Sequence, residues 1–308
     1  MGKALVIRGG ALGDFVLTLP AIRLLAEALE DTEVHVLGYS PMIQLAELAG
    51  LAVETRRIEH APLARFFVPG ADLDPTWKAY FASFDVILSY LHDPENIFHD
   101  NLLRAGAKPA NIYPAIHKVV DDPSSGHAVH QLAQPLEALA LYLVHPAPTL
   151  SLPPKTRTRI AIHPGSGAVW KNWPTNRWID LLPKLGKMLK PNEKIAIISG
   201  EAEEAWIDDF VAEARHAKVP LDLWRNPSLT DLANQLNSTR GFIGHDTGIS
   251  HLAAAAGTPS LVLFGATNPD VWAPRGEHVQ ILRSKDDRLL SITPEEVAAQ
   301  FNNVLNAD

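Results

Sequence analysis

The sequence contains no cysteine in its 308 residues. Disulfide bonds, thiolate nucleophiles and thiolate metal sites are therefore excluded, and a reducing compartment such as the cytoplasm fits best. The chain also lacks an apolar run long enough to cross a bilayer. Near the N-terminus, Arg8 and Asp14 interrupt the apolar stretch, so that no signal peptide is expected. These absences predict a cytoplasmic protein.

A basic excess is missing as well. The chain has 27 lysine and arginine residues against 35 aspartate and glutamate residues, and its formal net charge is -8. General binding to nucleic acid is disfavoured, because no cationic surplus neutralises a phosphate backbone, whereas a small phosphorylated ligand stays compatible. With 46% hydrophobic and 20% charged residues, the composition is that of an ordinary globular protein. The length fits two domains of roughly 150 residues each.

Short apolar runs that end in glycine alternate with amphipathic stretches along the chain. The run at 3–10 predicts a strand and a tight turn, and the apolar spacing over Asp14–Leu29 predicts a helix. Further strands are expected at 33–39, 84–90, 159–165, 194–200, 241–248 with its turn, and 260–265, and further helices at 42–48, 178–189, 229–237, 250–257 and 294–305. This alternation predicts an α/β protein with doubly wound parallel sheets.

The middle of the chain is rich in proline. Four of the 24 prolines fall within 145–156. Proline removes amide donors and stiffens a linker, and the strand and helix pattern restarts after this segment. We therefore expect a first domain over 1–150 and a second domain over 151–308.

The first turn, at 8–14, carries glycines where an open parallel sheet binds ligands, outside the carboxyl end of a strand. Glycines at this position let a ligand approach the backbone closely. The turn matches the dinucleotide fingerprint only in part, because Arg8 replaces the first glycine. The second strand also ends in Gly38 and Tyr39 rather than in an acidic ribose ligand, which disfavours a nicotinamide dehydrogenase.

Asp14 opens the helix after this turn, and two interpretations stay open. In the structural interpretation its carboxylate caps free amides at the helix start, where the helix dipole favours a negative charge. In the functional interpretation it is a base. A carboxylate beside a ligand site can accept the proton of an attacking hydroxyl.

The second domain opens with the turn 163–167, whose amides and serine hydroxyl could meet phosphate oxygens. Lys171 follows in the same loop and could bind a diphosphate as a point charge that stabilises a leaving group. A solvent-exposed loop lysine is the alternative. The nearby tryptophans are expected to pack in the core rather than to stack on a base; they are Trp170, Trp173 and Trp178.

The segment 244–251 again joins a strand end to a helix start. The amides of Thr247 and Gly248 are expected to point toward an anion. Asp246 would repel phosphate and is therefore assigned to sugar hydroxyls, and His251 lies one helical turn further on. Asp246 and His251 could also be metal ligands. No third ligand has helical spacing with them, so no metal is expected.

Together these segments resemble glycosyltransferase family 9, which contains the lipopolysaccharide heptosyltransferases. The resemblance is carried by RGGALGDFVLTLPAI (8–22), HPGSGAVWKNWP (163–174), SLTDLANQL (228–236) and GHDTGISHLAAAAGTPSLVLFGATNP (244–269). The last block is the most specific, because its motifs occur in the family's order and spacing. Nearly the whole chain is covered, more weakly between 50 and 140.

The resemblance implies an α/β protein with the GT-B fold, in which two Rossmann-like doubly wound parallel-sheet domains face a central cleft. It assigns the acceptor to the first domain, with Gly10 and Gly13 in its acceptor-side loop, and the nucleotide-sugar to the second. The last helix is expected to pack back on the first domain. Members of the family invert the anomeric centre without a metal, so no cofactor is expected and an ADP-sugar would be a substrate.

The same resemblance assigns roles to single residues. Asp14 matches the aspartate regarded as general base, and Lys171 matches the lysine that meets the donor phosphates. Pro227 departs from the family, because a methionine on the adenine side is expected there. The residues assigned to the donor are Ser166, Gly167, Lys171, Glu201, Ser228, Leu229, Asp246, Thr247, Gly248 and His251.

The function implied by the resemblance is transfer of a sugar, heptose from ADP-heptose, to a lipopolysaccharide-core or related glycan acceptor. The expected partners are the nucleotide-sugar and a glycan or glycolipid, with no nucleic acid. A monomer is expected, and peripheral contact with the inner membrane surface stays open. Two alternatives also stay open: a nucleotide-sugar epimerase on the same architecture, and a non-catalytic protein that binds nucleotide-sugars.

Overall fold

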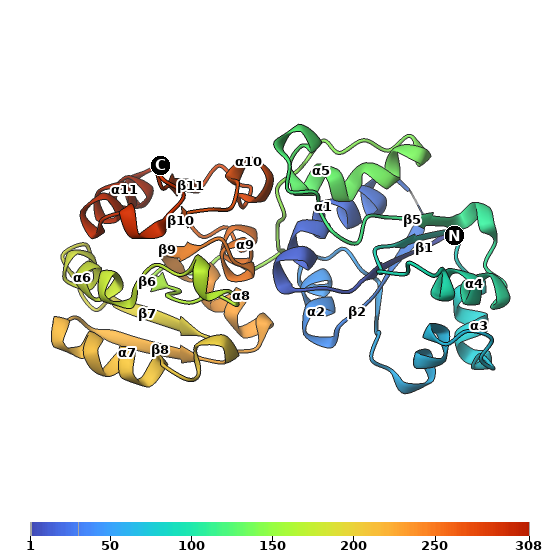
Figure 1. Cartoon of the computed structure of the whole chain (residues 1–308), viewed down its shortest axis with the longest axis horizontal. Helices are drawn as coiled ribbons and strands as arrows, with labels where there is room; N and C mark the ends of the chain where they lie inside the picture. Colours follow the sequence, from blue (N-terminus) through green and yellow to red (C-terminus); the bar gives the residue numbers. More distant parts are fainter. Residues whose placement is uncertain (1, 30, 308) are drawn as a thin grey trace. The chain divides into compact units, whose positions relative to one another are not determined.

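The computed structural model describes residues 2–29 and 31–307 and divides into two α/β units (Figure 1). Unit 1 comprises Met1–Val120 and Ala128–Pro146, and unit 2 comprises Asp121–His127 and Ala147–Asp308. The sequence predicts one boundary after residue 150 and misses that Asp121–His127 belongs to unit 2. None of the described helices has the length and apolar character that crossing a membrane requires.

Two side-chain contacts explain why Asp121–His127 joins unit 2. Trp272 Nε1 donates to Asp121 Oδ1 at 2.8 Å, and His127 Nε2 lies 2.8 Å from the carbonyl oxygen of Ala273. Both partners lie in or directly after the short helix α10 (Pro269–Trp272). Contacts between segments so distant in the chain leave no local pattern, so the sequence could not reveal them.

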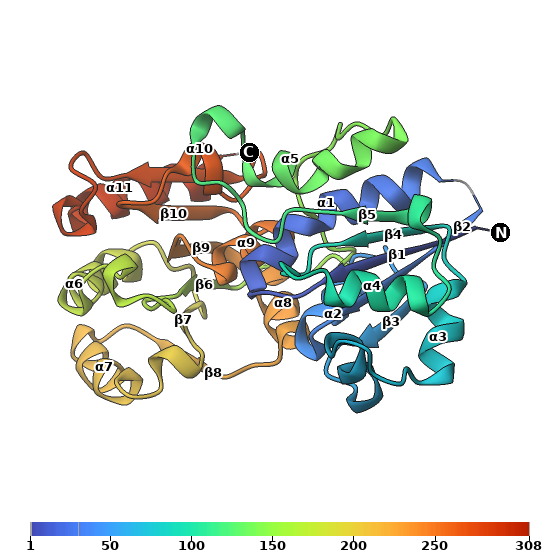
Figure 2. The same ribbon diagram turned by 45° about the vertical axis from the view of Figure 1, so that its right-hand side comes forward.

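Unit 1 is a five-stranded parallel sheet with the strand order β3-β2-β1-β4-β5 (Figure 2). Its strands are β1 (Gly2–Arg8), β2 (Thr32–Gly38), β3 (Glu54–Arg57), β4 (Val86–Ser89) and β5 (Ile112–Pro114). Its helices are α1 (Leu12–Ala28), α2 (Ser40–Leu48), α3 (Pro75–Ala82), α4 (Ile97–Arg104) and α5 (Ala128–Ala133), with 3-10 turns at Ala61–Phe67, Pro109–Asn111 and Gln134–Leu139.

The central strand β1 explains why unit 1 was readable from the sequence. Its consecutive residues from Ala4 to Ile7 are all fully buried, so apolar side chains point to both faces of the sheet. A parallel sheet covered by helices on both faces requires such a continuous apolar run. β1 pairs with β2 on one side and β4 on the other, with Val6 opposite both Val36 and Leu88.

Unit 2 is a six-stranded parallel sheet with the strand order β11-β10-β9-β6-β7-β8. Its strands are β6 (Arg159–Ile162), β7 (Lys194–Ser199), β8 (Leu221–Arg225), β9 (Thr239–His245), β10 (Ser260–Phe264) and β11 (Val279–Arg283). Its helices, besides α10, are α6 (Thr175–Gly186), α7 (Ile207–Ala214), α8 (Leu229–Asn237), α9 (Gly248–Ala255) and α11 (Pro294–Asn306), with 3-10 turns at Pro123–Ser125, Val169–Lys171, Glu201–Glu203, Arg215–Ala217 and Leu289–Ser291.

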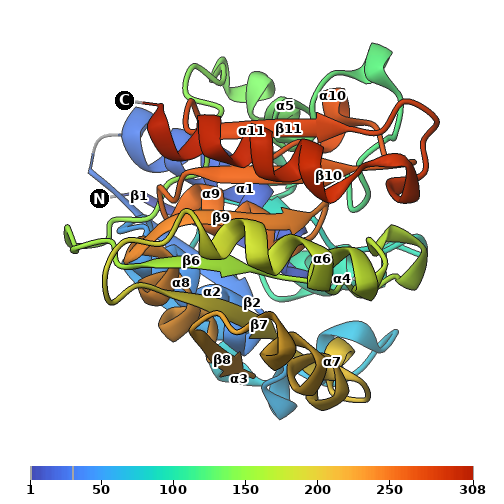
Figure 3. The same cartoon turned by 90° about the vertical axis from the view of Figure 1, so that its left-hand side faces the viewer.

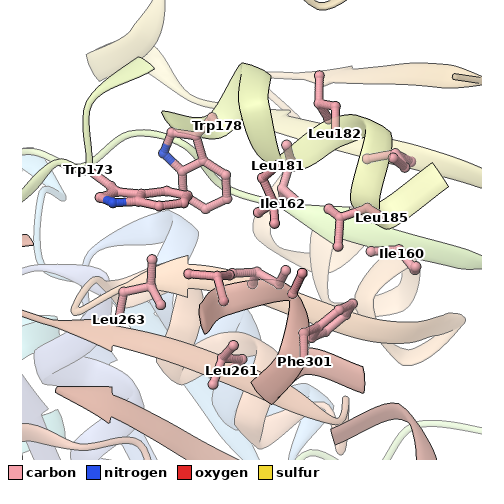
Figure 4. Packing of buried hydrophobic residues seen from close by; sticks show 14 of the residues in the cluster. Ile160, Ile162, Trp173, Trp178, Leu181, Leu182, Leu185, Leu261, Leu263 and Phe301 are labelled. Carbon is pink, nitrogen blue, oxygen red and sulfur yellow. The ribbon is translucent and has the colours of Figure 1, made fainter. Parts of the chain in front are cut away.

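One face of this second sheet carries a large apolar core. Figure 3 shows α6 and α11 lying across that face. Figure 4 shows Trp173 and Trp178 beside each other at the start of α6, above Ile162 of the sheet. Their rings meet edge to face, with centroids 5.2 Å apart, and both indoles are fully buried. The loop before α6 is therefore fixed by the core at its end.

The last helix, α11, packs within its own unit, and its expected contact with the first domain stays a prediction. The sequence pattern is amphipathic as predicted, but the apolar side of the helix packs on the sheet of its own unit. Val297, Phe301 and Val304 belong to the same buried cluster as Ile160 and Leu261. The physical reason is that this side of β6, β9 and β10 is apolar, and α11 covers it beside α6.

The strands that the sequence does not predict are those at the edges of the two sheets, β3, β5, β8 and β11. β3 has the sequence ETRR, and β5 has only three residues. The helix predicted at 178–189 begins three residues earlier, at Thr175, and ends at Gly186. Edge strands need no continuous apolar run, because one of their sides is not buried in the sheet. Their pattern is therefore hard to distinguish from a loop.

Replacing Phe301 by alanine tests the packing of α11. Phe301 is fully buried in the core of unit 2. We expect Phe301→Ala to lower the free energy of unfolding by about 3–5 kcal/mol through lost burial and a residual cavity. Denaturant unfolding followed by tryptophan fluorescence measures this. Asn302→Ala, at an exposed position of the same helix, should change it by less than about 0.5 kcal/mol; equal effects of the two variants would contradict this packing.

Candidate functional site

Both sheets place their first and fourth strands side by side. In unit 1 these strands are β1 and β4, and in unit 2 they are β6 and β9. The chain leaves such neighbouring strands in opposite directions, which opens a crevice at their carboxyl ends where ligands bind in open α/β sheets. Most of the predicted site residues follow β1, β6 and β9, and these residues therefore lie at the two crevices.

In unit 1 the crevice holds a cation and a carboxylate. Arg8 ends β1 with a side chain that is only 2% exposed, and its Nη2 lies 3.4 Å from Asp14 Oδ1. The guanidinium also lies 5.2 Å from the centroid of the Tyr90 ring and 3.5 Å from the His117 carbonyl oxygen. Burial lowers the pKa of Arg8, although the charge of Asp14 opposes this. In the sequence, Arg8 stands out only as a departure from a glycine motif, and this role is missed.

Asp14 is the third residue of α1 and not its cap residue, which is Ala11. Its Oδ2 accepts a hydrogen bond from the Ala11 amide at 3.2 Å. A β-carbon at Gly10 would lie 3.0 Å from the same oxygen, and the φ of +99° at Gly10 favours glycine in any case. Asp14 therefore accepts from a free amide at the start of α1, as the structural interpretation predicts, although it is not the cap residue itself. It leaves the side chain 36% exposed, so that capping and proton acceptance are compatible.

A cavity of about 520 Å³ lies beside this pair. It is lined by Arg8, Gly9, Gly10, Tyr39, Ile58, Glu59, Phe67, Tyr90, Leu91, His92 and His117. The rings of His92 and His117 contact each other, with centroids 4.3 Å apart. Of the two glycines predicted for the acceptor-side loop, Gly10 lines the cavity, and Gly13 lies within the first turn of α1.

In unit 2 the crevice holds a tighter ion pair. Lys171 Nζ donates to Asp246 Oδ2 at 2.8 Å, and the two side chains are 26% and 9% exposed. Lys171 also lies 5.3 Å from the ring centroid of Trp170. The sequence assigns these two residues to different parts of the donor, because a carboxylate repels phosphate. The structure pairs them, and a paired carboxylate no longer presents an isolated negative charge.

A cavity of about 310 Å³ adjoins the pair. The carboxyl ends of several strands supply its walls, which include Trp170, Lys171, Asn172, Asp246, Gly265, Thr267, Asp287, Arg288 and Leu290. Trp170 is 66% exposed, so the prediction that it packs in the core is wrong, whereas Trp173 and Trp178 are buried as predicted. Arg288 adds a second cation to this wall, which no motif in the sequence points to.

The N-terminus of α9 borders the same crevice. Thr247 is its cap residue, and Thr247 Oγ1 is buried without a hydrogen-bond partner among the described residues. Gly248 begins the helix, so that its amide is among the free donors of the first turn. His251 lies in the next turn and is only 4% exposed. An unpaired buried hydroxyl beside free helix amides is an arrangement that an anionic or hydroxylated ligand would complete.

The loop after β6 uses its serine internally. Ser166 is 7% exposed, and its hydroxyl lies 2.6 Å from Asn172 Oδ1 and 2.7 Å from the Ala168 carbonyl oxygen. A β-carbon at Gly167 would meet nothing within 4 Å, so the backbone is open to a ligand there. Gly167 is thus the better-placed of the two predicted phosphate contacts, while Ser166 shapes the loop.

The other predicted donor residues lie at the ends of β7 and β8. Glu201 is exposed at the start of the turn after β7. Ser228 caps α8, accepting from the Asp231 amide at 3.1 Å and donating to its carboxylate at 2.7 Å. Leu229 is the first residue of α8 and is partly buried. Their contact with a donor stays a prediction.

Glu203, and not Glu201, is the buried acid of this turn. It is 2% exposed, lies 3.6 Å from His163 Nε2, and accepts from the Gly200 amide at 2.7 Å. Burial acts to raise the pKa of Glu203, but His163 and the Gly200 amide outweigh it and hold the pKa below its ordinary value. The proximity of Glu203 to the loop after β6 could not be read from the sequence.

If Asp246 and His251 held a metal ion, the described part of the chain would provide no third ligand beside them. Among residues 2–29 and 31–307, no group of three or more histidine, aspartate or glutamate side chains is arranged to hold a metal ion. Asp246 is instead paired with a lysine.

Replacing Arg8 by methionine tests the buried cation of unit 1. Arg8 Nε and Nη2 have no hydrogen-bond partner among the described residues, so the burial of the charge is weakly compensated. Its partner Asp14 is partly exposed and can be hydrated when left alone. We expect Arg8→Met to leave the free energy of unfolding unchanged or to raise it by about 1–2 kcal/mol. Denaturant unfolding measures this; a loss above about 2 kcal/mol would make Arg8 a structural anchor.

Comparison with known proteins gives these two crevices a context. Residues 122–296 match the family model of glycosyltransferase family 9 (heptosyltransferase). The lipopolysaccharide heptosyltransferase 1 of Escherichia coli (strain K12) is 22% identical over 134 residues, which make up 44% of this chain and 40% of that protein. The matched region therefore spans less than half the length of this curated relative.

Solved structures are similar over nearly the whole chain. The glycosyl transferase family 9 from Veillonella parvula DSM 2008 has a TM-score of 0.78 at 16% identity, with 99% of this chain and 97% of that chain covered. The E. coli heptosyltransferase WaaC with ADP has a TM-score of 0.75 at 15% identity, with 98% and 99% covered. This likeness establishes the GT-B fold. Because the family model covers more than half of the sequence, the chain belongs to glycosyltransferase family 9.

Proposed function

We propose that the chain is an inverting, metal-independent glycosyltransferase that moves heptose from ADP-heptose to a lipopolysaccharide-core or related glycan acceptor. The observation that carries this proposal is the pairing of Lys171 with Asp246 at the N-terminus of α9, beside a cavity of about 310 Å³. Membership of the family supports the reaction class. The similar E. coli heptosyltransferase WaaC was solved with ADP, which supports the choice of nucleotide.

Unit 2 is proposed to hold the donor. The Lys171 ammonium has three N–H groups, and one of them is used by Asp246. The others can donate to diphosphate oxygens while the pair with Asp246 persists. The amides at Gly167 and at the start of α9 add uncharged donors for the same oxygens. As the bond between the anomeric carbon and the phosphate oxygen breaks, the electron pair stays with the diphosphate, and Lys171 stabilises the growing charge.

Unit 1 is proposed to supply the base. The acceptor hydroxyl attacks the anomeric carbon on the face opposite the diphosphate, which inverts the centre, and its proton passes to the Asp14 carboxylate. Arg8 fixes the position of Oδ1, and the Ala11 amide fixes that of Oδ2. Each oxygen retains a lone pair for the proton. No metal is needed in this scheme, because side-chain and amide donors stabilise the leaving group.

A donor screen tests the proposal directly. ADP-heptose should raise the melting temperature more than UDP-, GDP- or CDP-sugars, because a ligand that binds only the native state stabilises it by mass action. With a lipopolysaccharide-core acceptor, transfer should be observed and should persist in EDTA. Loss of transfer in EDTA with recovery in magnesium would overturn the metal-independent mechanism. Conversion of the nucleotide-sugar without any acceptor would identify an epimerase instead.

Asp14→Asn separates the catalytic from the capping role of this side chain. The asparagine oxygen can still accept from the Ala11 amide, but it cannot take up a proton at neutral pH. We expect turnover to fall by roughly two to four orders of magnitude, with ADP binding unchanged. The melting temperature should fall, because the buried Arg8 guanidinium loses its counter-charge. Glu296→Gln is the matched control, because Glu296 accepts from the Thr293 amide at the same position of α11. Wild-type turnover in Asp14→Asn would reduce Asp14 to a cap.

Lys171→Ala tests the charge at the leaving group. We expect donor KM to rise and kcat to fall, with a loss of about 2–4 kcal/mol in transition-state stabilisation, because the contact strengthens as charge develops. The variant also leaves the buried Asp246 unpaired, so its melting temperature should drop. Adding Asp246→Asn should restore the melting temperature without restoring turnover.

Single-turnover rates at saturating donor separate binding from chemistry for these variants. Lys187→Ala, at an exposed lysine of the same unit, should match the wild-type protein in donor KM and kcat. If Lys171→Ala reaches the wild-type rate at saturation, Lys171 binds the donor without assisting bond cleavage.

A further inference from the structure

His245 lies next to the loop of unit 2 that carries Lys171. It is the last residue of β9 and directly precedes Asp246. Its side chain is fully buried, and its ring meets the edge of Trp178 at a centroid distance of 5.4 Å. Nothing in the proposed chemistry uses this imidazole. A buried polar ring at the end of a central strand therefore calls for an explanation.

The two ring nitrogens of His245 reach the two ends of one loop. Nε2 lies 2.9 Å from the amide nitrogen of Trp173, and Nδ1 lies 3.3 Å from the carbonyl oxygen of Gly165. An amide can only donate, so Nε2 accepts and carries no proton. Nδ1 then carries the proton and donates to the carbonyl oxygen of Gly165. The backbone partners thus select one neutral tautomer, and burial in addition lowers the pKa of His245 to about 3.

The loop between these two contacts, 165–173, contains Gly167 and Lys171. Lys171 is paired with Asp246, the residue next to His245. Two neighbouring residues therefore hold this loop. The ring of His245 contacts both of its ends, and the carboxylate of Asp246 binds Lys171. In Figure 4, Trp173 lies beside Trp178 at the far end of this loop. The loop is held at three points from one strand end.

Gly165, at the start of the loop, also packs closely against Glu203. A β-carbon at Gly165 would lie 2.1 Å from Glu203 Oε1, so only glycine fits there. Glu203 is held by the Gly200 amide and lies near His163. The Gly165 carbonyl is thereby kept in position to accept from His245. The loop has little freedom to shift as a whole unless the contacts of His245 break.

We propose that His245 is a positioning residue: as a neutral imidazole protonated on Nδ1, it holds the loop 165–173 so that Lys171 and the Gly167 backbone meet the donor diphosphate. The inference rests on the proposed function for the identity of the ligand. It predicts that breaking the contacts weakens donor binding and slows bond cleavage together. The binding of the acceptor should not change, because the contacts lie within unit 2.

Three substitutions separate the two contacts. His245→Gln places an amide oxygen near the position of Nε2 and can accept from Trp173. His245→Asn places an amide group near Nδ1 and can donate to Gly165. His245→Leu fills the space and makes neither contact. We expect His245→Leu to lower kcat/KM for the donor by roughly 10- to 100-fold, since small displacements of a positioning group have effects of that size. Each amide variant should recover part of the loss.

Three measurements other than activity report on the contacts between His245 and the loop 165–173. In wild-type protein, nitrogen NMR should show a His245 ring protonated on Nδ1 that does not titrate between pH 5 and 8. In His245→Leu, hydrogen exchange should accelerate within 165–173 and stay unchanged in the other strands of unit 2. Affinity for ADP, measured by calorimetry, should fall in parallel. His278→Leu is the matched control, because His278 contacts the Ala254 carbonyl, at the other end of α9, and should leave ADP affinity unchanged.

The outcomes separate this inference from the proposed function. A wild-type protein that binds ADP but transfers no sugar would overturn the transferase assignment alone, and ADP affinity would then decide the role of His245. Wild-type kinetics, ADP affinity and loop exchange in His245→Leu would overturn the positioning role. If His245→Leu does not fold, the amide variants decide, and wild-type donor kinetics in both of them would overturn the proposal. A ring protonated on Nε2 would do so as well.

Discussion

The ion pair between Lys171 and Asp246 is the contact on which the donor side of this protein depends. Asp246 is 9% exposed at the end of a central strand, and a carboxylate so deeply buried is stable only with a partner. Lys171 supplies the opposite charge at 2.8 Å from a loop that has little regular structure of its own. The position of the loop is therefore coupled to the burial of one carboxylate. The neutral pair also lets a diphosphate approach without meeting an isolated negative charge.

Each unit has an ion pair at the end of a central strand, and the two pairs have opposite arrangements of charge. In unit 1 the cation, Arg8, is buried at the strand end, and the carboxylate of Asp14 is the exposed member of the pair. In unit 2 the carboxylate is buried, and the ammonium of Lys171 is the more exposed member. The exposed group is the one that a ligand meets. A carboxylate suits the proton of a hydroxyl, and an ammonium suits a diphosphate, so each crevice has the polarity that its proposed chemistry requires.

The sequence predicted the features that depend on residues close together in the chain. The apolar runs of β1, β6, β7 and β10 revealed both sheets, because strands covered on both faces need continuous apolar residues. The turn glycines and the positions of Asp14, Lys171 and Asp246 followed from strand ends in the same way. The pairing of Lys171 with Asp246 joins residues 75 positions apart, and no periodicity encodes it. Repulsion between Asp246 and phosphate was sound reasoning about an isolated carboxylate, but the carboxylate is not isolated.

His245 shows why a neutral group suits the support of this loop. The loop ends offer one donor, the Trp173 amide, and one acceptor, the Gly165 carbonyl. A neutral imidazole has one of each, at opposite corners of a rigid ring, so it satisfies both without leaving a polar atom unpaired. A charged side chain at this depth would require a counter-ion, and the carboxylate whose charge acts on His245, Glu203, is already held by the Gly200 amide and lies beside His163. Neutral support therefore adds no charge that would compete with the Lys171 ammonium for Asp246 or for the donor.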